Sequence, residues 1–328
     1  MKGCPVAELK NTFSLSASQI ENFKSCPRKY WFSRYGSWGG WDPSADERTR
    51  SIYRQKQLTN VYLWTGDKVH KAIKGILESF ATGQGVPDEA AVLADLLEEL
   101  REDYRESLSQ VPGGPIEKGT LRLIEHDEPA LCISASKWKE LTDRALEAVR
   151  GFYRSEAFKC IVAGGPEALV RRDNVLETMR LSVDGREVPV YVTIDVMVKA
   201  GEQFLILDWK TGKPRKDAAK DQLGLYALYV ANLYAAPAED VFFAPVYLAY
   251  TPEVFDPVQS SNAALEESRA SLENSAREIL ARVADPDNGV AEECQFEALP
   301  TKFGCRNCVY RNLCSGYKDL RANDAIQF

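Results

Sequence analysis

The sequence predicts an α/β fold with one core, helical additions and a short cysteine-rich tail. Apolar residues recur at helical spacing through the first half of the chain, and the pattern changes to strands between residues 160 and 210. A helix–strand–helix series follows, and the cysteine-rich tail ends the chain. This continuous order favours one core over independent domains, although 328 residues would suffice for about two.

Four helices are predicted in the N-terminal half. The first begins at Ser18, where SQIE fits a capping box with Ser18 as the N-cap and Glu21 three residues later. Residues 36–45, GSWGGWDPSA, predict a glycine-rich loop. The other helices are predicted over residues 65–81, 88–109 and 137–159.

Strands dominate the next part of the pattern. Two apolar runs, Val190–Val198 and Phe204–Leu207, each predict a buried strand. The remaining elements are a helix over 217–234, a strand over 241–251 and an amphipathic helix over 262–284. Asp195 lies inside the first run and Asp208 follows the second, which requires an explanation because burying an unpaired charge is costly.

Composition and charge restrict the class of protein. Hydrophobic residues make up 45% and charged residues 27% of the chain, which is ordinary for a soluble globular protein. No apolar run approaches the ~18 residues of a membrane span, and the N-terminus lacks the apolar segment of a signal peptide. We therefore expect a cytoplasmic protein whose eight cysteines are metal ligands or free thiols. The net charge of −7 means that any nucleic-acid binding must use a local basic surface.

The segment KAGEQ between the two apolar runs predicts a hairpin. Glycine at the first position of a two-residue loop, Gly201–Glu202, is typical of a type II′ turn. Pairing outward from this loop places Asp195 opposite Asp208, and opposed residues point to the same face of a sheet. Lys210 lies two residues further on and shares that face. The sequence therefore predicts two carboxylates and an ammonium group close together.

Such a group has two interpretations. Two adjacent carboxylates repel each other unless a cation lies between them, and their oxygens suit Mg²⁺ or Mn²⁺. A metal-activated water could then attack a phosphodiester, with Lys210 assisting. The alternative is a pair of sheet-end aspartates with Lys210 as a salt-bridge partner, and the spacing by itself favours that alternative. Further residues are needed to decide.

Two helices supply such residues. Gln222 and Tyr226 are four residues apart and share one face of a predicted helix. His70, one of two histidines in the chain, lies on the helix predicted over 65–81. A lone histidine is more often an ordinary helix residue than a metal ligand.

Four cysteines form a second group. Cys305, Cys308 and Cys314 follow the spacing C-x₂-C-x₅-C, and Cys26 lies near the other end of the chain in FKSCPRKYWF. Three clustered thiolates leave one position open on a tetrahedral zinc ion or on an iron–sulfur cluster. The spacing does not distinguish between these two.

The combination of motifs resembles the PD-(D/E)XK nuclease superfamily, specifically its RecB-type nucleases. The matching residues, in order, are His70, Asp195, the DWKTG segment with Asp208 and Lys210, and the QLGLY segment with Gln222 and Tyr226. The resemblance implies a restriction-endonuclease-like core, with metal bound by the histidine and both aspartates. It also implies that Lys210 is the catalytic lysine and that Gln222 and Tyr226 border the DNA cleft.

Two further points concern this resemblance. Thr193 stands where the family commonly has a glycine, which removes no ligand. Glu167 is a candidate for an additional acidic residue of the site.

The N-terminal segment SLSASQIENFKSCPRKYWF is similar to that of iron–sulfur RecB-type nucleases, including AddB-type subunits and CRISPR-associated exonucleases. This similarity implies a [4Fe–4S] cluster held by Cys26 together with Cys305, Cys308 and Cys314. It implies a single nuclease domain over 1–328, a helical insertion over 83–160 and an iron–sulfur tail over 294–328 that pairs with Cys26.

We therefore expect a Mg²⁺- or Mn²⁺-dependent deoxyribonuclease, an exonuclease acting on single strands or DNA ends in repair, recombination or defence. The alternative is a non-catalytic or partner-dependent DNA-binding component of a CRISPR-adaptation or other defence complex. No G-x₄-G-K-[ST] motif occurs, so a helicase would have to be a partner chain.

Basic residues could contact phosphates near these motifs, or they could form solvated faces. One group comprises Lys24, Arg28, Lys29 and Arg34, and the other comprises Lys213, Arg215, Lys216 and Lys220. Trp38 and Trp41 could stack on bases, although packing within their loop is the favoured interpretation.

Overall fold

The computed structural model describes residues 9–117, 119–171, 177–214, 220–249 and 255–323, and these form two compact units. Unit 1 comprises residues 1–57, 180–191 and 273–328, and unit 2 comprises residues 58–179 and 192–272. The predicted single domain over 1–328 stays a prediction. No helix in the described ranges is long and apolar enough to cross a membrane.

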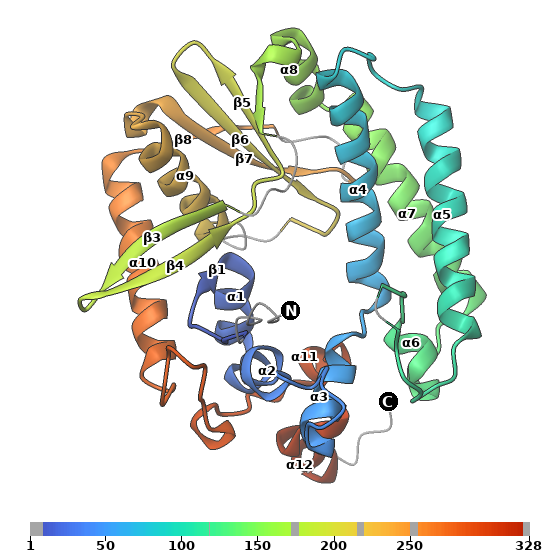
Figure 1. Cartoon of the computed structure of the whole chain (residues 1–328). Helices are drawn as coiled ribbons and strands as arrows, with labels where there is room; N and C mark the ends of the chain where they lie inside the picture. Colours follow the sequence, from blue (N-terminus) through green and yellow to red (C-terminus); the bar gives the residue numbers. More distant parts are fainter. Residues whose placement is uncertain (1–8, 118, 172–176, 215–219, 250–254, 324–328) are drawn as a thin grey trace, which may run out of the picture. The chain divides into compact units, whose positions relative to one another are not determined.

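A five-stranded sheet, in the order β2-β5-β6-β7-β8, forms the centre of unit 2 (Figure 1). Strands β5 and β6 form an antiparallel hairpin, whereas β6 and β7 run parallel and are connected through a helix. Such a parallel pair needs a crossover, which places a helix against the sheet. The strands are β2 (Leu169–Arg171), β5 (Val196–Ala200), β6 (Gln203–Lys210), β7 (Val241–Tyr247) and β8 (Val258–Gln259).

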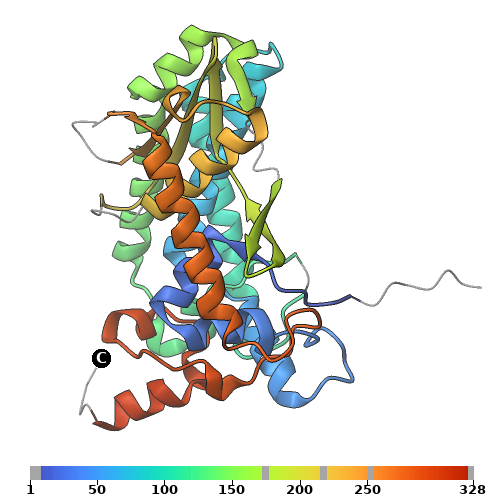
Figure 2. The ribbon, with the colours of Figure 1, turned by 90° about the vertical axis from the view of Figure 1, so that its left-hand side faces the viewer.

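Helices cover this sheet. Figure 1 and the turned view in Figure 2 show α4, α5 and α7 side by side, and α4 and α7 pack together. Phe152 of α7 meets Trp209 of β6 edge to face, with the ring centroids 5.2 Å apart, so this layer closes over the sheet. Helix α9, which connects β6 to β7, also packs on these two strands. The helices are α4 (Val61–Ala81), α5 (Glu89–Ser109), α6 (Ile124–Asp127), α7 (Ala135–Arg154), α8 (Glu156–Gly164) and α9 (Lys220–Tyr234).

The predicted helices 65–81 and 88–109 are confirmed by α4 and α5, but the single helix over 137–159 is wrong. Ser155 separates α7 from α8, with an extended backbone at φ −65° and ψ 145°. Its hydroxyl accepts a hydrogen bond from the Phe158 N–H at 3.0 Å and caps the second helix. Because a serine can cap a new helix in this way, the second helix begins directly after the first. The apolar residues therefore keep a helical spacing although the helix is interrupted.

The predicted strand Val190–Val198 also divides in two. Strand β4 ends at Val192 and β5 begins at Val196, and the two belong to different sheets. Residues 193–195 connect them. Asp195 therefore stands just before a buried strand rather than inside one, which explains how the chain tolerates a carboxylate there.

Unit 1 contains the N-terminal helices, most of a hairpin and the C-terminal tail. Asp184 and Gly185 form the hairpin turn, with φ of 49° and 81°, values typical of a type I′ turn. Its strands and helices are β1 (Leu15–Ser16), β3 (Glu177–Val183), β4 (Arg186–Val192), α1 (Ala17–Ser25), α2 (Pro27–Trp31), α3 (Glu47–Lys56), α11 (Lys302–Arg306) and α12 (Ser315–Asn323). Helix α10 (Asn262–Leu280) and strand β3 contribute residues to both units.

The first helix begins two residues earlier than its capping box predicts. Ser16, not Ser18, is the N-cap of α1, and its hydroxyl accepts from the Gln19 N–H at 3.3 Å. The reason is that Ser16 pairs with Tyr191 of β4, so the chain is extended up to this residue and turns into the helix immediately afterwards.

A buried arginine ties together the helical layer of unit 2. Arg122 is 1% exposed, and its guanidinium donates to Asp127 at 3.1 Å and to the carbonyls of Ser107, Gln110 and His126. All of its donors therefore lie in protein rather than in water, where an incomplete set of partners would be costly.

We expect Arg122→Met to lower the free energy of unfolding by about 3–5 kcal/mol, because it breaks a buried charge network. Arg101→Met is the matched control, since Arg101 is a half-exposed partner of Glu98 at 3.4 Å and should cost about 1 kcal/mol or less. Urea unfolding of both variants measures the difference. Equal losses would show that the network contributes no special stability.

Candidate active site

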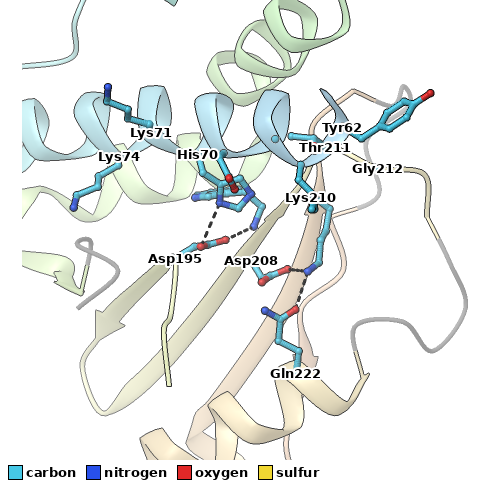
Figure 3. A pocket seen from close by; sticks show the side chains of 14 residues that line it. Tyr62, His70, Lys71, Lys74, Asp195, Asp208, Lys210, Thr211, Gly212 and Gln222 are labelled. Carbon is cyan, nitrogen blue, oxygen red and sulfur yellow. Dashed lines mark hydrogen bonds and ion pairs between the residues drawn. The ribbon is translucent and has the colours of Figure 1, made fainter. Parts of the chain in front are cut away.

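A pocket of about 510 Å³ lies in unit 2 between α4, the β5–β6 hairpin and α9 (Figure 3). It brings together five of the six catalytic and metal-binding residues predicted from the sequence, namely His70, Asp195, Asp208, Lys210 and Gln222. Tyr226, the sixth, contacts this group through Gln222. Helix α4 reaches the end of β6 at Gly66, where an added Cβ would lie 3.3 Å from the Thr211 hydroxyl.

The hairpin has the predicted register. Ala200 pairs with Gln203, and pairing continues outward to Val196 and Leu207. Asp195 immediately precedes β5, and Asp208 is the residue of β6 that follows Leu207. Gly201 has φ +60°, as the predicted turn requires. The alternation of side chains in β6 then places Asp208 and Lys210 on one face.

Asp195 is held by two contacts. Its Oδ2 accepts a hydrogen bond from the Trp209 backbone N–H at 2.9 Å, and its Oδ1 lies 3.4 Å from His70 Nδ1 (Figure 3). Burial opposes the charge of His70, but Asp195, Asp208 and Asp67 outweigh it and raise the pKa of the imidazole. The histidine thus stands in a field of three carboxylates.

Asp208 is 2% exposed, an unusual position for a carboxylate. Its Oδ2 lies 2.6 Å from Lys210 Nζ but makes no hydrogen bond of good geometry with the described residues. Burial raises the pKa of Asp208 to about 6, and the charge of Asp195 adds to the effect against the opposing charge of Lys210. This buried and incompletely satisfied oxygen is a suitable ligand for a cation.

A polar relay runs from the lysine into the core. Lys210 Nζ donates to Gln222 Oε1 at 2.8 Å, and Gln222 Nε2 donates to the Tyr226 hydroxyl at 2.7 Å. Tyr226 is buried, which raises its pKa, so its hydroxyl remains protonated at neutral pH. The relay fixes the direction of the ammonium group toward Asp208.

The donor set suits Mg²⁺ or Mn²⁺ in its chemistry, because two carboxylates and an imidazole face one pocket. The observation that supports such a fit is the burial of Asp208, whose Oδ2 faces the pocket group with the Lys210 ammonium at 2.6 Å as its cationic partner. In the described residues, however, no three His, Cys, Asp or Glu side chains are arranged closely enough to hold a metal ion as they stand. Metal binding would require a local adjustment, such as displacement of Lys210 from Asp208.

Two acidic residues differ from the sequence-based prediction. Asp67, which the prediction omitted, lines the pocket one turn before His70 on α4, and that helical spacing was the available signal. Glu167 is not brought to the site. It lines a separate pocket with Cys160 and Lys199 at the far end of the β5–β6 hairpin, because η3 (Pro166–Ala168) precedes a strand paired near Val198.

We expect the contribution of Asp208 to the stability of the metal-free protein to fall as the pH rises from about 4 to about 7. Asp208 has a folded-state pKa above its ordinary value, so the folded state binds its proton more tightly and the advantage disappears as that proton leaves. The shift corresponds to about 3 kcal/mol. Asp208→Asn should therefore be increasingly stabilising relative to wild type across this range in a chelator, as measured by urea unfolding at several pH values. A difference independent of pH would contradict the assignment.

The four predicted cluster cysteines all lie in unit 1 and are half-buried. Cys26 stands between α1 and α2, Cys305 lies on α11, and Cys308 and Cys314 follow it. Burial raises the pKa of Cys305, and the nearby thiols of Cys314 and Cys26 raise it further. Burial also raises the pKa of Cys308 to about 11, and the thiols of Cys26 and Cys305 raise it further. The four thiols are therefore neighbours, although no metal-holding arrangement is present among the described cysteines.

Aromatic packing brings the two ends of the chain together in unit 1. Tyr310, between Cys308 and Cys314, stacks on Phe32 with ring centroids 5.3 Å apart. Phe296 stacks on Tyr30 at 6.1 Å. The early Cys-Pro segment and the cysteine-rich tail thus meet through buried rings, independently of any metal.

The predicted basic clusters are only partly available to a ligand. Arg28 is engaged within unit 1, with Glu293 at 2.8 Å and the Phe296 carbonyl at 2.7 Å, and Arg34 donates to Ser14 at 3.1 Å. Arg215 and Lys216 lie outside the described residues. Trp38 and Trp41 meet edge to face, with ring centroids 5.0 Å apart, which confirms packing within their loop.

Two solved structures show weak likenesses to the chain. The chain has the TM-score 0.43 and 15% identity with the crystal structure of a "putative exonuclease" from Eubacterium rectale, over 100% of this chain and 96% of that one. It has the TM-score 0.32 and 15% identity with the crystal structure of SSO0001, over 68% of this chain and 96% of that one. Likenesses this weak carry no conclusion, and the comparison with curated proteins finds no match.

The family profile is decisive. The profile of the PD-(D/E)XK nuclease superfamily matches residues 14–315, which is most of the chain and includes every predicted site residue. The chain belongs to the PD-(D/E)XK nuclease superfamily.

Proposed function

We propose that the protein is a Mg²⁺- or Mn²⁺-dependent deoxyribonuclease that hydrolyses phosphodiester bonds at DNA ends or in single strands, as an exonuclease. The observation that carries the proposal is the buried Asp208 carboxylate, which faces the same pocket as Asp195 and His70 and contacts Lys210. A charge in a 2% exposed position needs cationic partners, and Lys210 offsets the burial of Asp208 only in part, because the pKa of the carboxyl is still raised. Membership of a nuclease superfamily supports the reaction class.

In this proposal each residue has one task. Asp208, Asp195 and His70 would hold the metal ion, which supplies Lewis-acid stabilisation of the phosphate and activation of water. Lys210 would donate to the phosphate oxygens as negative charge develops on them. Gln222, fixed by Tyr226, orients the lysine so that its ammonium group does not have to reorganise during the reaction.

We further propose that Cys26, Cys305, Cys308 and Cys314 hold a [4Fe–4S] cluster. The support is that the four thiols are neighbours in unit 1 and that thiolate is the ligand such clusters use. Zinc uses the same ligands and is the alternative. In this role the cluster joins the two ends of the chain and takes no part in hydrolysis.

The test is incubation of end-labelled single-stranded and double-stranded DNA with the purified chain and Mg²⁺ or Mn²⁺. We expect progressive shortening that a chelator stops. Products of one internal length would indicate an endonuclease, and intact DNA under all conditions would contradict the proposal. Repeating the assay with helicase or CRISPR-adaptation proteins separates a partner-dependent enzyme from a non-catalytic DNA-binding component.

His70 has a distinct expected role. We expect His70→Ala to raise the Mn²⁺ concentration needed for half the maximal rate by about 10–100-fold, because the imidazole beside Asp195 is one of the proposed metal ligands. His126→Ala is the matched control, since this second histidine contacts Ser107 at 2.9 Å and does not line the pocket. Metal titration of the rate, with a thermal melt of each variant, separates the two. An unchanged metal requirement in His70→Ala would exclude a ligand role.

A further inference from the structure

The α4 residues that line the pocket form one continuous stripe. Tyr62, Gly66, His70 and Lys74 are spaced four residues apart, and Leu63, Asp67 and Lys71 run beside them. The apolar face of α4 is separate and is used for packing, because Trp64, Val69 and Ile73 are buried. The stripe therefore presents two apolar side chains at its first turn, a histidine in the middle and lysines further along.

Tyr62 and Leu63 are exposed where the other apolar residues of α4 are covered. Tyr62 is 48% exposed and Leu63 is 61% exposed. Figure 3 shows the Tyr62 ring beyond the Lys210, Thr211 and Gly212 side of the site, directed out toward solvent. An exposed aromatic ring that lines the same pocket as two acidic residues and a lysine offers a flat apolar surface to a bound ligand.

The backbone beneath this ring is fixed. Asn60 is buried, and its side-chain oxygen accepts hydrogen bonds from the backbone N–H groups of Tyr62 and Leu63, at 3.0 Å each. Lys137 Nζ lies 5.7 Å from the centroid of the Tyr62 ring. The helix turn that carries the ring is therefore held in place before a ligand binds, which lowers the ordering cost of stacking.

The dimensions suit a nucleic-acid strand. Tyr62 and His70 are eight residues apart on α4, which corresponds to about 12 Å along the helix axis. That length is about that of three stacked nucleotides of one strand. A phosphate at the carboxylate site would thus leave a base about three nucleotides along the strand within reach of the ring. In a duplex the base faces are covered by their neighbours, so only an unpaired base can be received.

We propose that Tyr62 is a specificity-determining residue that stacks on an unpaired base about three nucleotides from the scissile phosphate, so that the pocket selects single-stranded or frayed DNA. This inference rests on the proposed nuclease function. Lys71 and Lys74 line the other end of the stripe and pair there with Glu99 and Glu78. A strand on this path would replace those carboxylates as the partners of the two ammonium groups. Leu63 covers the edge of the stacked base.

The test measures binding of oligonucleotides by fluorescence anisotropy in the Lys210→Ala background with a chelator present, which keeps the carboxylates and removes the metal needed for hydrolysis. Tyr62→Ala should weaken single-strand binding by about 5- to 150-fold, the range for loss of one base–aromatic stack, and leave blunt duplex binding within twofold. Tyr62→Phe should remain within about twofold of the background, whereas Tyr62→Leu should lose most of the affinity despite its apolar surface. Leu108→Ala, which removes an exposed apolar side chain from α5, is the control.

A second measurement identifies the base. A series of single strands, each with one abasic site at a different position, is bound to the Lys210→Ala protein. We expect only one position of the abasic site to weaken binding. Tyr62→Ala should abolish this effect, because the ring and that base form a coupled pair. With Lys210 intact, Tyr62→Ala should raise KM for single strands and change kcat little. A merely structural role would not produce this split.

Three outcomes would overturn the proposal. Tyr62→Ala could bind single strands as Leu108→Ala does, or it could lose single-strand and duplex affinity equally. It could instead convert a dimer to a monomer in size-exclusion chromatography with single-strand affinity unchanged, which would make the patch a protein contact. If the wild-type chain cleaves single strands but Tyr62→Ala matches it, only this inference fails; if the wild-type chain neither binds nor cleaves DNA, the proposed function fails with it.

Discussion

Asp208→Asn is expected to reduce DNA hydrolysis by about 10³-fold or more while the protein stays folded. The substitution keeps the size of the side chain but removes the charge that would hold the metal, and metal stabilisation of the transition state contributes several kcal/mol. Burial disfavours the charged form of this carboxyl group. The melting temperature of metal-free Asp208→Asn should therefore be no lower than that of the metal-free wild-type protein. Initial rates at saturating Mn²⁺, together with thermal melts, measure both effects.

Two other variants complete this test. Lys210→Ala should lower the rate by about 10²–10³-fold with metal binding largely kept, as expected for loss of a positioned cationic donor. Asp143→Asn is the control, since this aspartate pairs with Lys139 on the exposed face of α7 and should retain full activity. Asp208→Asn that digests DNA at the wild-type rate would show that the hydrolytic site lies elsewhere.

Cys26→Ala is expected to abolish the brown colour of the protein, lower its melting temperature and promote aggregation. Joining Cys26 to the cysteines after residue 304 closes a loop of about 280 residues, for which the loop-closure free energy is ~5 kcal/mol in an unconstrained chain. The rings of Phe32 and Tyr310 already bring these segments together, so the net effect should be smaller. It would still be a large part of the ~5–15 kcal/mol that stabilises a typical protein.

Iron and sulfide analysis after anaerobic purification measures the cluster, and calorimetry measures the stability. Cys132→Ala is the matched control, because this cysteine is exposed and belongs to unit 2. Stoichiometric zinc without iron in the wild-type protein would exclude the iron–sulfur cluster but keep the metal as a link between the chain ends. An iron-replete and equally stable Cys26→Ala protein would exclude both.

The hairpin that carries the candidate site could be predicted because its signals are local. Gly201 supplies the positive φ of the turn, and the strict alternation of a strand then determines that Asp195 and Asp208 share a face. The spacing of Gln222 and Tyr226 likewise predicts a common helix face, and the two side chains are hydrogen-bonded there. Each of these inferences depends on one short stretch of chain with a known geometry, Asp195–Asp208 for the hairpin and Gln222–Tyr226 for the helix face.

The sequence did not predict features that depend on distant partners. Strand β4 ends at Val192 and β5 begins at Val196 because the two strands pair in different sheets. A continuous apolar run does not show which sheet each of its residues joins. Glu167 lies in another pocket because of where β2 pairs along β5. The Asp184–Gly185 turn, by contrast, carried a local signal, since Asp-Gly is typical of such hairpins.

The most direct test of the metal site is the anomalous diffraction of crystals soaked in Mn²⁺. The account predicts one manganese peak about 2.0–2.4 Å from carboxylate oxygens of both Asp195 and Asp208, with Lys210 moved off Asp208, and no such peak in Asp208→Asn crystals. A manganese peak bound elsewhere in a protein that cleaves DNA, or the same peak in the variant, would contradict it.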